Sequence, residues 1–190
     1  MKKTLVLLLS MVALQVSAQN FAAVDKSIMD VVYFPQGAHR VYMVKTVEEK
    51  AKLMPKIKIT YSRPLLNGRK AFGELVKFDQ SWRLGANEST EITFYQAVRI
   101  GDVVLAPGRY TLYCTPSATS WKLKVHPNVD GWGSFGYDET KDIATITANT
   151  TNTETKIEAF SIAMYEASPK VVHIKVGWEN TIVEFPVTLL

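Results

Sequence analysis

A two-residue period in hydrophobicity constrains this chain more than any other feature, and it recurs from residue 56 to the C-terminal end. Ile57, Ile59 and Tyr61, for example, alternate with polar side chains. Successive side chains of a strand point to opposite faces, so each such segment has one buried side and one side in water, as in antiparallel sheets. The same pattern recurs in residues 91–94, 110–115, 121–125, 172–178 and 183–189.

Turn-forming dipeptides such as Pro107-Gly108 separate these segments, and no helical period lies between them. Closely spaced short strands of this kind are typical of a β-sandwich or barrel. We therefore predict an all-β fold, an antiparallel β-sandwich of about nine strands. Residues 47–54 carry helix-forming side chains before Pro55 and predict at most one short helix.

The first eighteen residues have the pattern of a cleavable export signal. Lys2 and Lys3 precede an apolar stretch, and small side chains at residues 16–18 predict cleavage before Gln19. The apolar run is shorter than the roughly 20 residues that a membrane-spanning helix needs. A short buried helix is the alternative interpretation. We expect a periplasmic or secreted protein with no membrane span in the mature chain.

The chain divides into three expected parts: a signal peptide over 1–18, an extended lead-in with a surface insertion over 19–55, and the β-sandwich domain over 56–190. Hydrophobic residues make up 47% of the sequence and charged residues 21%, which excludes a fully disordered chain. Removal of residues 1–18 lowers the formal net charge from +4 to +2. No run of Lys and Arg is present, so we expect no nucleic-acid partner.

Strong catalytic and metal-binding signatures are missing from the sequence. It contains no Gly-rich phosphate loop, no G-x-S-x-G motif and no H-E-x-x-H motif. The single cysteine, Cys114, excludes an internal disulfide, and its place in an alternating segment predicts a buried, unreactive thiol. His39, His126 and His173 are far apart. We therefore expect neither a metal site nor a cofactor, and we assign no catalytic residue.

Polar side chains gather among aromatic residues and glycines between residues 61 and 90. The conspicuous ones are Arg63, Arg69, Arg83, Asn87 and Glu88. Such a segment suits a carboxylate, a phosphate or a sugar hydroxyl as ligand. In the alternative interpretation the arginines bond Glu88 and loop carbonyls and only hold a long connection in place. Arg83 and Glu88 lie five residues apart, a spacing that lets the loop fold back, and we predict that they form a buried ion pair because Trp82 and Gly85 beside them indicate a packed turn.

A second aromatic segment follows at residues 130–138, where Trp132, Phe135 and Tyr137 stand beside glycines. These rings either stack on a sugar or cap an open end of the sandwich, and we favour the cap. The candidate ligand-binding set combines both segments: Arg63, Arg69, Trp82, Arg83, Asn87, Glu88 and Trp132.

Several short motifs together carry a family resemblance. They are Arg63-Pro64, Gly68-Arg69, Phe72-Gly73, Trp82-Arg83-x-Gly85-Ala86-Asn87-Glu88-x-Thr90, Pro107-Gly108-x-Tyr110-x-Leu112 and Trp132-Gly133. This string resembles the bacterial domain of unknown function 2911 family, from about Asp25 to Leu189. The resemblance implies an exported protein of Bacteroidota-type envelopes, with no known activity and no catalytic residues to carry over. The chain departs from the family pattern at residues 77–79, where members often carry Pro or Tyr.

Three functions follow as hypotheses. The first is a non-enzymatic envelope module that binds a small polar or carbohydrate-like ligand. The second is a hydrolase acting on a glycan or envelope polymer, for which Glu88 needs a second carboxylate. The third is a structural envelope protein without a ligand. The carboxylates considered as partners of Glu88 are Asp130, Asp138 and Asp142.

Overall fold

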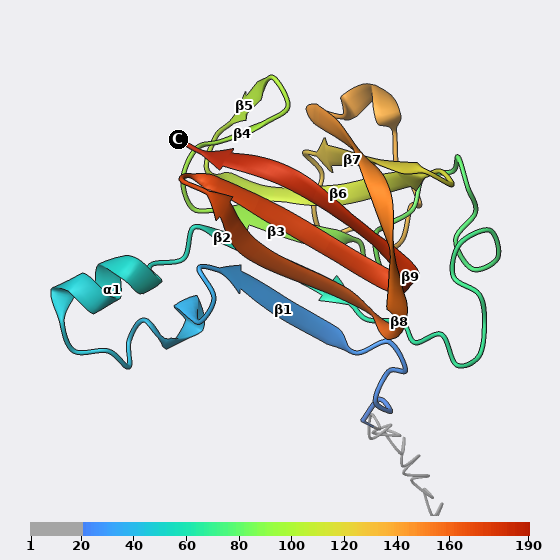
Figure 1. The fold of residues 1–190 in the computed structure, drawn as a ribbon, viewed down its shortest axis with the longest axis horizontal. Helices are drawn as coiled ribbons and strands as arrows, with labels where there is room; N and C mark the ends of the chain where they lie inside the picture. Colours follow the sequence, from blue (N-terminus) through green and yellow to red (C-terminus); the bar gives the residue numbers. More distant parts are fainter. Residues whose placement is uncertain (1–20) are drawn as a thin grey trace, which may run out of the picture.

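Nine antiparallel strands form one hydrogen-bonded sheet in the computed structural model, which describes residues 21–190 (Figure 1). Their order across the sheet is β1-β2-β3-β6-β7-β8-β9-β4-β5. The predicted all-β, antiparallel fold is therefore confirmed. The strands are β1 Met29–Phe34, β2 Ile57–Ser62, β3 Thr90–Phe94, β4 Val98–Ile100, β5 Val103–Leu105, β6 Gly108–Pro116, β7 Ser120–His126, β8 Ala144–Ser168 and β9 Val171–Leu189.

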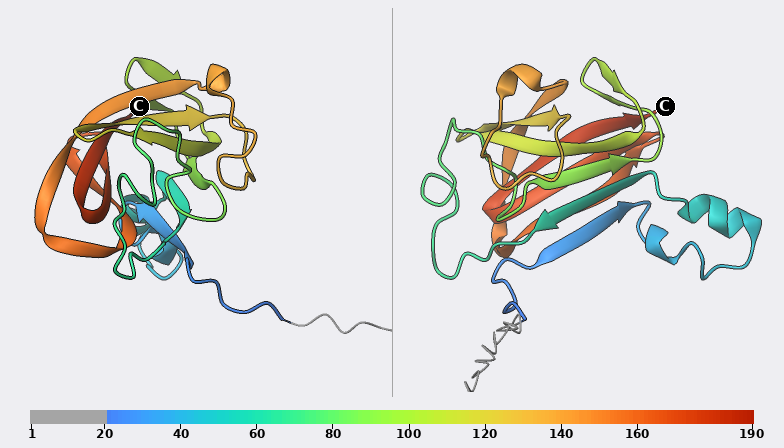
Figure 2. Two further views of the ribbon diagram at one scale, coloured as in Figure 1. Left: turned by 90° about the vertical axis from the view of Figure 1, so that its right-hand side faces the viewer. Right: turned by 180° about the vertical axis from the view of Figure 1, so that it is seen from behind.

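Strand β8 joins the two halves of this sheet. Residues 144–149 of β8 pair with β7, and residues 150–168 pair with β9. The β8–β9 register shifts at three places, and such irregularities bend a strand. The sheet therefore curls over its own core, as Figure 2 shows from the side, and Phe160 of β8 packs edge-on against Tyr61 of β2 with ring centroids 5.8 Å apart. This curled arrangement is consistent with the predicted sandwich.

An aromatic cluster fills the core next to residues 61–90, the segment with the conspicuous polar side chains. Trp82 stacks on Trp178 at 6.1 Å between centroids and also contacts Trp121 and Phe160. Its indole Nε1 donates a hydrogen bond to the carbonyl oxygen of Gly85 at 3.0 Å. Trp82 thereby fixes the start of the loop that runs to β3.

The backbone of Trp82 also pairs with Cys114 of β6. The thiol of Cys114 is completely buried, and burial raises its pKa above the ordinary value. The predicted burial of Cys114 is confirmed, and a raised pKa is the property expected of an unreactive thiol.

One short α-helix, α1 (Val47–Leu53), lies within the residues predicted to be helical. Thr46 and Glu49 form a capping box at its N-terminus, and none of its side chains is buried. It projects from one end of the sheet (Figure 1). Two single-turn 3-10 helices, η1 (Ala38–Arg40) and η2 (Glu139–Lys141), complete the helical content of the described residues.

The N-terminal segment of the described chain is part of the sheet. Strand β1, within the predicted lead-in, pairs with β2 over its whole length and forms one edge. The predicted signal peptide over 1–18 lies outside the described residues. Among residues 21–190, no helix is long and apolar enough to cross a membrane.

Candidate functional site

Two loops that are far apart in the sequence meet at one end of the sheet. Ser89 donates its backbone N–H to the carbonyl of Gly131 at 2.9 Å, and Gly133 donates to the carbonyl of Asn87 at 2.9 Å. We call the segment between Trp82 and Thr90 the motif loop and residues 130–134 the aromatic loop. The two segments that sequence analysis treated separately therefore form one structure, with a cavity on either side of it.

The first cavity, which we call the cationic cleft, has a volume of about 390 Å³. Three cationic side chains line it, Arg69, Lys77 and Arg83, and none of its lining residues is a carboxylate. Arginine and lysine side chains favour a carboxylate or phosphate as partner. The remaining lining residues are Ser27, Pro64, Leu75, Val76, Gln80, Ser81, Trp82, Gly85, Ala86, Ser134 and Trp178.

Of the three arginines in the predicted set, Arg63 and Arg69 donate side-chain hydrogen bonds and Arg83 donates none among the described residues. Its Nε is buried and has no hydrogen-bond partner among the described residues. Gly133 of the aromatic loop lies against the other end of the guanidinium, so that a Cβ at that position would be 2.7 Å from Nη1. The guanidinium therefore packs close to the backbone of the aromatic loop, and no hydrogen bond from its side chain is formed among the described residues.

The predicted buried ion pair between Arg83 and Glu88 is wrong. Both residues lie in the described part of the chain, and no ion pair joins them. Glu88 is exposed and lines the other cavity. The loop between them turns through left-handed conformations at Leu84 (φ 54°) and Asn87 (φ 55°), which sends the two side chains to opposite sides.

Arg63 has a structural role instead. Its Nε donates to the carbonyl of Phe160 at 3.1 Å, Nη1 to Asp30 at 3.0 Å and Nη2 to the Ser161 hydroxyl at 2.9 Å. These bonds tie the end of β2 to β1 and β8. Arg63 lies outside the cationic cleft and fits the alternative interpretation, in which an arginine only holds a connection.

Arg69 bonds the carbonyls of its own loop and also lines the cationic cleft, so it fits both the structural and the ligand-binding interpretation. Its Nε and Nη2 donate to the carbonyls of Leu66 (2.9 Å) and Leu65 (2.8 Å), so its conformation is fixed by its own loop. Its charge nevertheless lines the cationic cleft. A guanidinium held in this way loses little freedom when it binds an anion.

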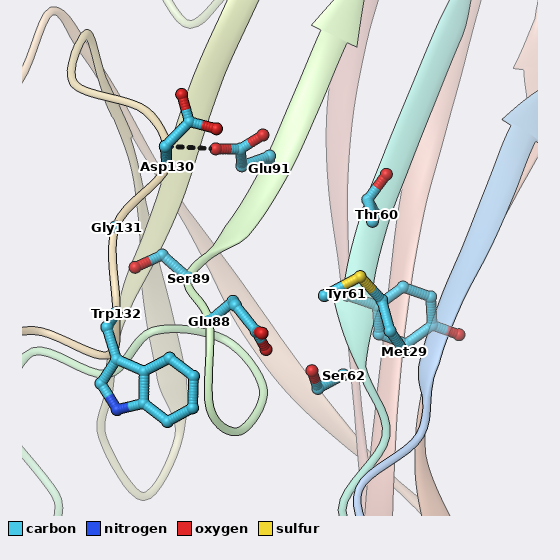
Figure 3. Close-up of a pocket in the computed structure, with 10 residues that line it drawn as sticks. All are labelled: Met29, Thr60, Tyr61, Ser62, Glu88, Ser89, Glu91, Asp130, Gly131 and Trp132. Carbon is cyan, nitrogen blue, oxygen red and sulfur yellow. Dashed lines mark hydrogen bonds between the residues drawn. The ribbon is translucent and has the colours of Figure 1, made fainter. Parts of the chain in front are cut away.

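The second cavity, which we call the acidic pocket, has a volume of about 360 Å³ (Figure 3). Three carboxylates line it, those of Glu88, Glu91 and Asp130. Arg109 forms ion pairs with Glu91 at 3.3 Å and with Asp130 at 2.5 Å, whereas Glu88 forms none among the described residues. Its other lining residues are Met29, Thr60, Tyr61, Ser62, Ser89, Gly131 and Trp132.

Asn87 lines neither cavity. Its side-chain Nδ2 donates to Asp25 at 2.9 Å, and its positive φ belongs to the turn of the motif loop. The structure thus divides the predicted set: Arg69, Trp82 and Arg83 line the cationic cleft, Glu88 and Trp132 line the acidic pocket, and Arg63 and Asn87 have structural contacts elsewhere.

Several lining residues escaped the sequence analysis. Lys77 and Ser81 lie before the motif loop, and Ser62 ends β2, but none belongs to a recognisable signature. Their positions depend on how the motif loop packs against the rest of the fold, and local sequence patterns do not predict this packing. Among residues 21–190, no group of three or more His, Cys, Asp or Glu side chains is placed to hold a metal ion.

Comparisons with known proteins add a family and no activity. A family model described as "Protein of unknown function (DUF2911)" matches residues 43–187. Searches of curated proteins and of solved structures find no significant match.

Proposed function

The chain belongs to the DUF2911 family, as its motif string predicts, and from the cationic cleft we propose that it is an exported, non-enzymatic module that binds a small polar ligand through an anionic group. One observation carries this proposal. Three cationic side chains line the cleft without a carboxylate, and the buried Nε of Arg83 has no partner in the described residues.

The Nε of Arg83, which has no partner among the described residues, raises the free energy of the protein without ligand. A buried donor without an acceptor costs about 1–3 kcal/mol, more when it is charged. A carboxylate or phosphate oxygen that bonds this Nε would remove that cost and gain a charge-assisted hydrogen bond. Arg69 adds a second positive charge that its own loop already holds in place. Both features favour an anion over a neutral ligand.

The size of the cleft sets the scale of the ligand. A volume of about 390 Å³ falls in the usual range of small-molecule sites, roughly 300–1,000 Å³. Ser81 and Ser134 line the cleft and offer hydroxyls to a polar body. A uronic acid or a phosphorylated small molecule has this combination of an anionic group and hydroxyls.

The hydrolase alternative is less well supported. Most glycosidases need two carboxylates that flank the scissile bond, one as an acid. Asp130 is the only predicted partner that lines the same pocket as Glu88, and Arg109 already binds its carboxylate. Glu88 is left without a second free carboxylate, so the geometry favours binding over hydrolysis.

Export is the second part of the proposal. Its support is the pattern of residues 1–18, in which two lysines precede an apolar stretch and small residues. A periplasmic or secreted binding module meets small anionic sugars and phosphates of the cell envelope, which is the ligand class that the cleft suits.

Titration calorimetry on the mature chain tests the binding. We expect sodium phosphate and sodium glucuronate to bind saturably, and neutral glucose to bind at least about tenfold more weakly, which is a difference of roughly 1.4 kcal/mol. Arg83→Gln should abolish both signals. Arg99→Gln removes an equal charge from an exposed position on β4 that does not line the cleft, and it should leave both unchanged.

Two results would overturn the proposal. Equal affinity for glucose and glucuronate would show that the cations do not select the ligand. A parent protein that binds neither anion would favour the structural envelope protein without a ligand.

A further inference from the structure

We propose that the acidic pocket is a second, independent binding site, and that it takes the ammonium group of a small organic amine. The pocket lies between the end of β2, the motif loop and the aromatic loop (Figure 3). Its residues and its charge differ from those of the cationic cleft, so this inference does not rest on the function proposed above.

The charge of the pocket favours a cation. Three carboxylates line it, and within residues 21–190 a single guanidinium pairs with them, that of Arg109, which is shared between Glu91 and Asp130. None of the lining residues is itself a Lys or Arg. The carboxylate of Glu88 therefore remains available to a positively charged ligand.

A buried hydroxyl gives the pocket a second polar contact. Ser62, the last residue of β2, is only 1% exposed, and its Oγ has no hydrogen-bond partner among the described residues. Buried hydroxyls without a partner are uncommon in folded proteins. In Figure 3 the Glu88 carboxylate and the Ser62 hydroxyl point toward one another across the pocket. An ammonium group between them can donate to both oxygens.

An exposed aromatic ring completes the site. Trp132 is 56% exposed although it lines the pocket, and its backbone pairs with that of Glu88. The face of an indole attracts a cation within about 6 Å of the ring centre. Met29 lies on the opposite side of the pocket in Figure 3 and offers an apolar contact to the body of the ligand.

The same observations favour an organic cation over a metal ion. Among the described residues, the three carboxylates of the pocket do not form a group that could hold a metal ion. Mg²⁺ prefers oxygen ligands and keeps most of its bound waters, so the side chains of Trp132 and Met29 offer it no ligand. An amine with an apolar body contacts every free feature of the pocket: one carboxylate, one hydroxyl, one indole face and one thioether.

Titration calorimetry with n-butylammonium chloride tests the site, with n-butanol as the neutral analogue and magnesium chloride as the inorganic cation. We expect saturable binding of butylammonium alone. Glu88→Gln should weaken it by about tenfold or more, which is the loss of one charge-assisted hydrogen bond. Ser62→Ala should weaken it several-fold. Glu154→Gln, which removes an exposed carboxylate from β8, is the matched control and should leave it unchanged.

The outcomes separate cleanly. Butylammonium binding that is equal in the parent and in Glu88→Gln, or butanol binding of equal strength, would overturn the proposal. Magnesium binding that Glu88→Gln abolishes would replace the organic cation with a metal. Because phosphate binding depends on Arg83, a failed phosphate titration leaves this test intact, and a failed butylammonium titration leaves the proposed function intact.

Discussion

Arg83 and Glu88 stand in the same loop, yet Arg83 lines the cationic cleft and Glu88 lines the acidic pocket. Two residues between them are fixed in the fold. Leu84 is completely buried, and the carbonyl of Gly85 accepts a hydrogen bond from the indole of Trp82. The motif loop is therefore a partition between two cavities of opposite charge. Substitutions on its two sides should affect different ligands.

Stability measurements should distinguish the arginine that holds the fold from the one that lines the cleft. Arg63→Ala breaks three hydrogen bonds between strands and should lower the free energy of unfolding by about 1–3 kcal/mol. Neither Arg83→Ala nor Glu88→Ala should lower it by more than about 1 kcal/mol, because neither leaves a bonded partner behind, and Arg83→Ala also removes an unpartnered buried donor. Urea unfolding measures all three. A loss of about 3 kcal/mol or more in both Arg83→Ala and Glu88→Ala would restore the buried pair.

Gly133→Ala should act on the cationic cleft without touching a charge. Gly133 has φ 66°, and a Cβ there would lie 2.7 Å from Nη1 of Arg83, so the guanidinium must move. We expect phosphate binding to weaken several-fold and stability to fall by about 1–2 kcal/mol from the left-handed backbone.

Gly136→Ala is the matched control for Gly133→Ala. Gly136 has a similar φ of 72°, but nothing lies within 4 Å of a Cβ at that position. Its stability loss should be comparable and its phosphate affinity unchanged. Equal affinity losses in the two variants would attribute the effect to backbone strain rather than to Arg83.

Acid should weaken the β8–β9 half of the sheet through Glu184. Burial alone raises the pKa of this carboxyl, but hydrogen bonds with His173 and Tyr165 and the ion pair with Lys175 together hold it below the ordinary value. The folded protein then binds the proton less tightly than the unfolded chain does. The stabilisation is complete above the unfolded pKa and is lost as the pH falls through the folded one.

Urea unfolding between pH 3 and pH 7 measures this effect on the parent and on Glu184→Gln. The variant should be less stable than the parent near neutral pH, and the difference should shrink as the solution becomes acidic. Parallel pH curves for the two proteins would contradict a lowered pKa at Glu184.

Export predicts a defined mature N-terminus. The native protein, purified from its source, should begin at Gln19 and be recovered from the periplasm or the medium. Intact-mass spectrometry and cell fractionation measure both. An N-terminus at Met1, or recovery of most of the protein from the cytosol, would contradict the prediction.

The sequence by itself determined the family and six alternating segments, which lie in β2, β3, β6, β7 and β9. Ile57, Ile59 and Tyr61 are buried in β2 as their alternation predicts, because the two faces of a strand follow from chain geometry alone. The helix at Val47–Leu53 could be predicted for a similar reason, since its helix formers and the following proline are local. The motif string likewise identified the family over most of the chain.

Only the tertiary structure decided what the motif residues do. Arg63, Arg69 and Arg83 have the same chemistry in the sequence, but Phe160, Leu66 and Gly133 give them three different environments. Those neighbours come from β8, from a nearby turn and from the aromatic loop. Whether a guanidinium is saturated depends on acceptors that the folded chain brings to it, and spacing along the sequence does not specify them. The two cavities exist for the same reason, because the motif loop and the aromatic loop meet only in the fold.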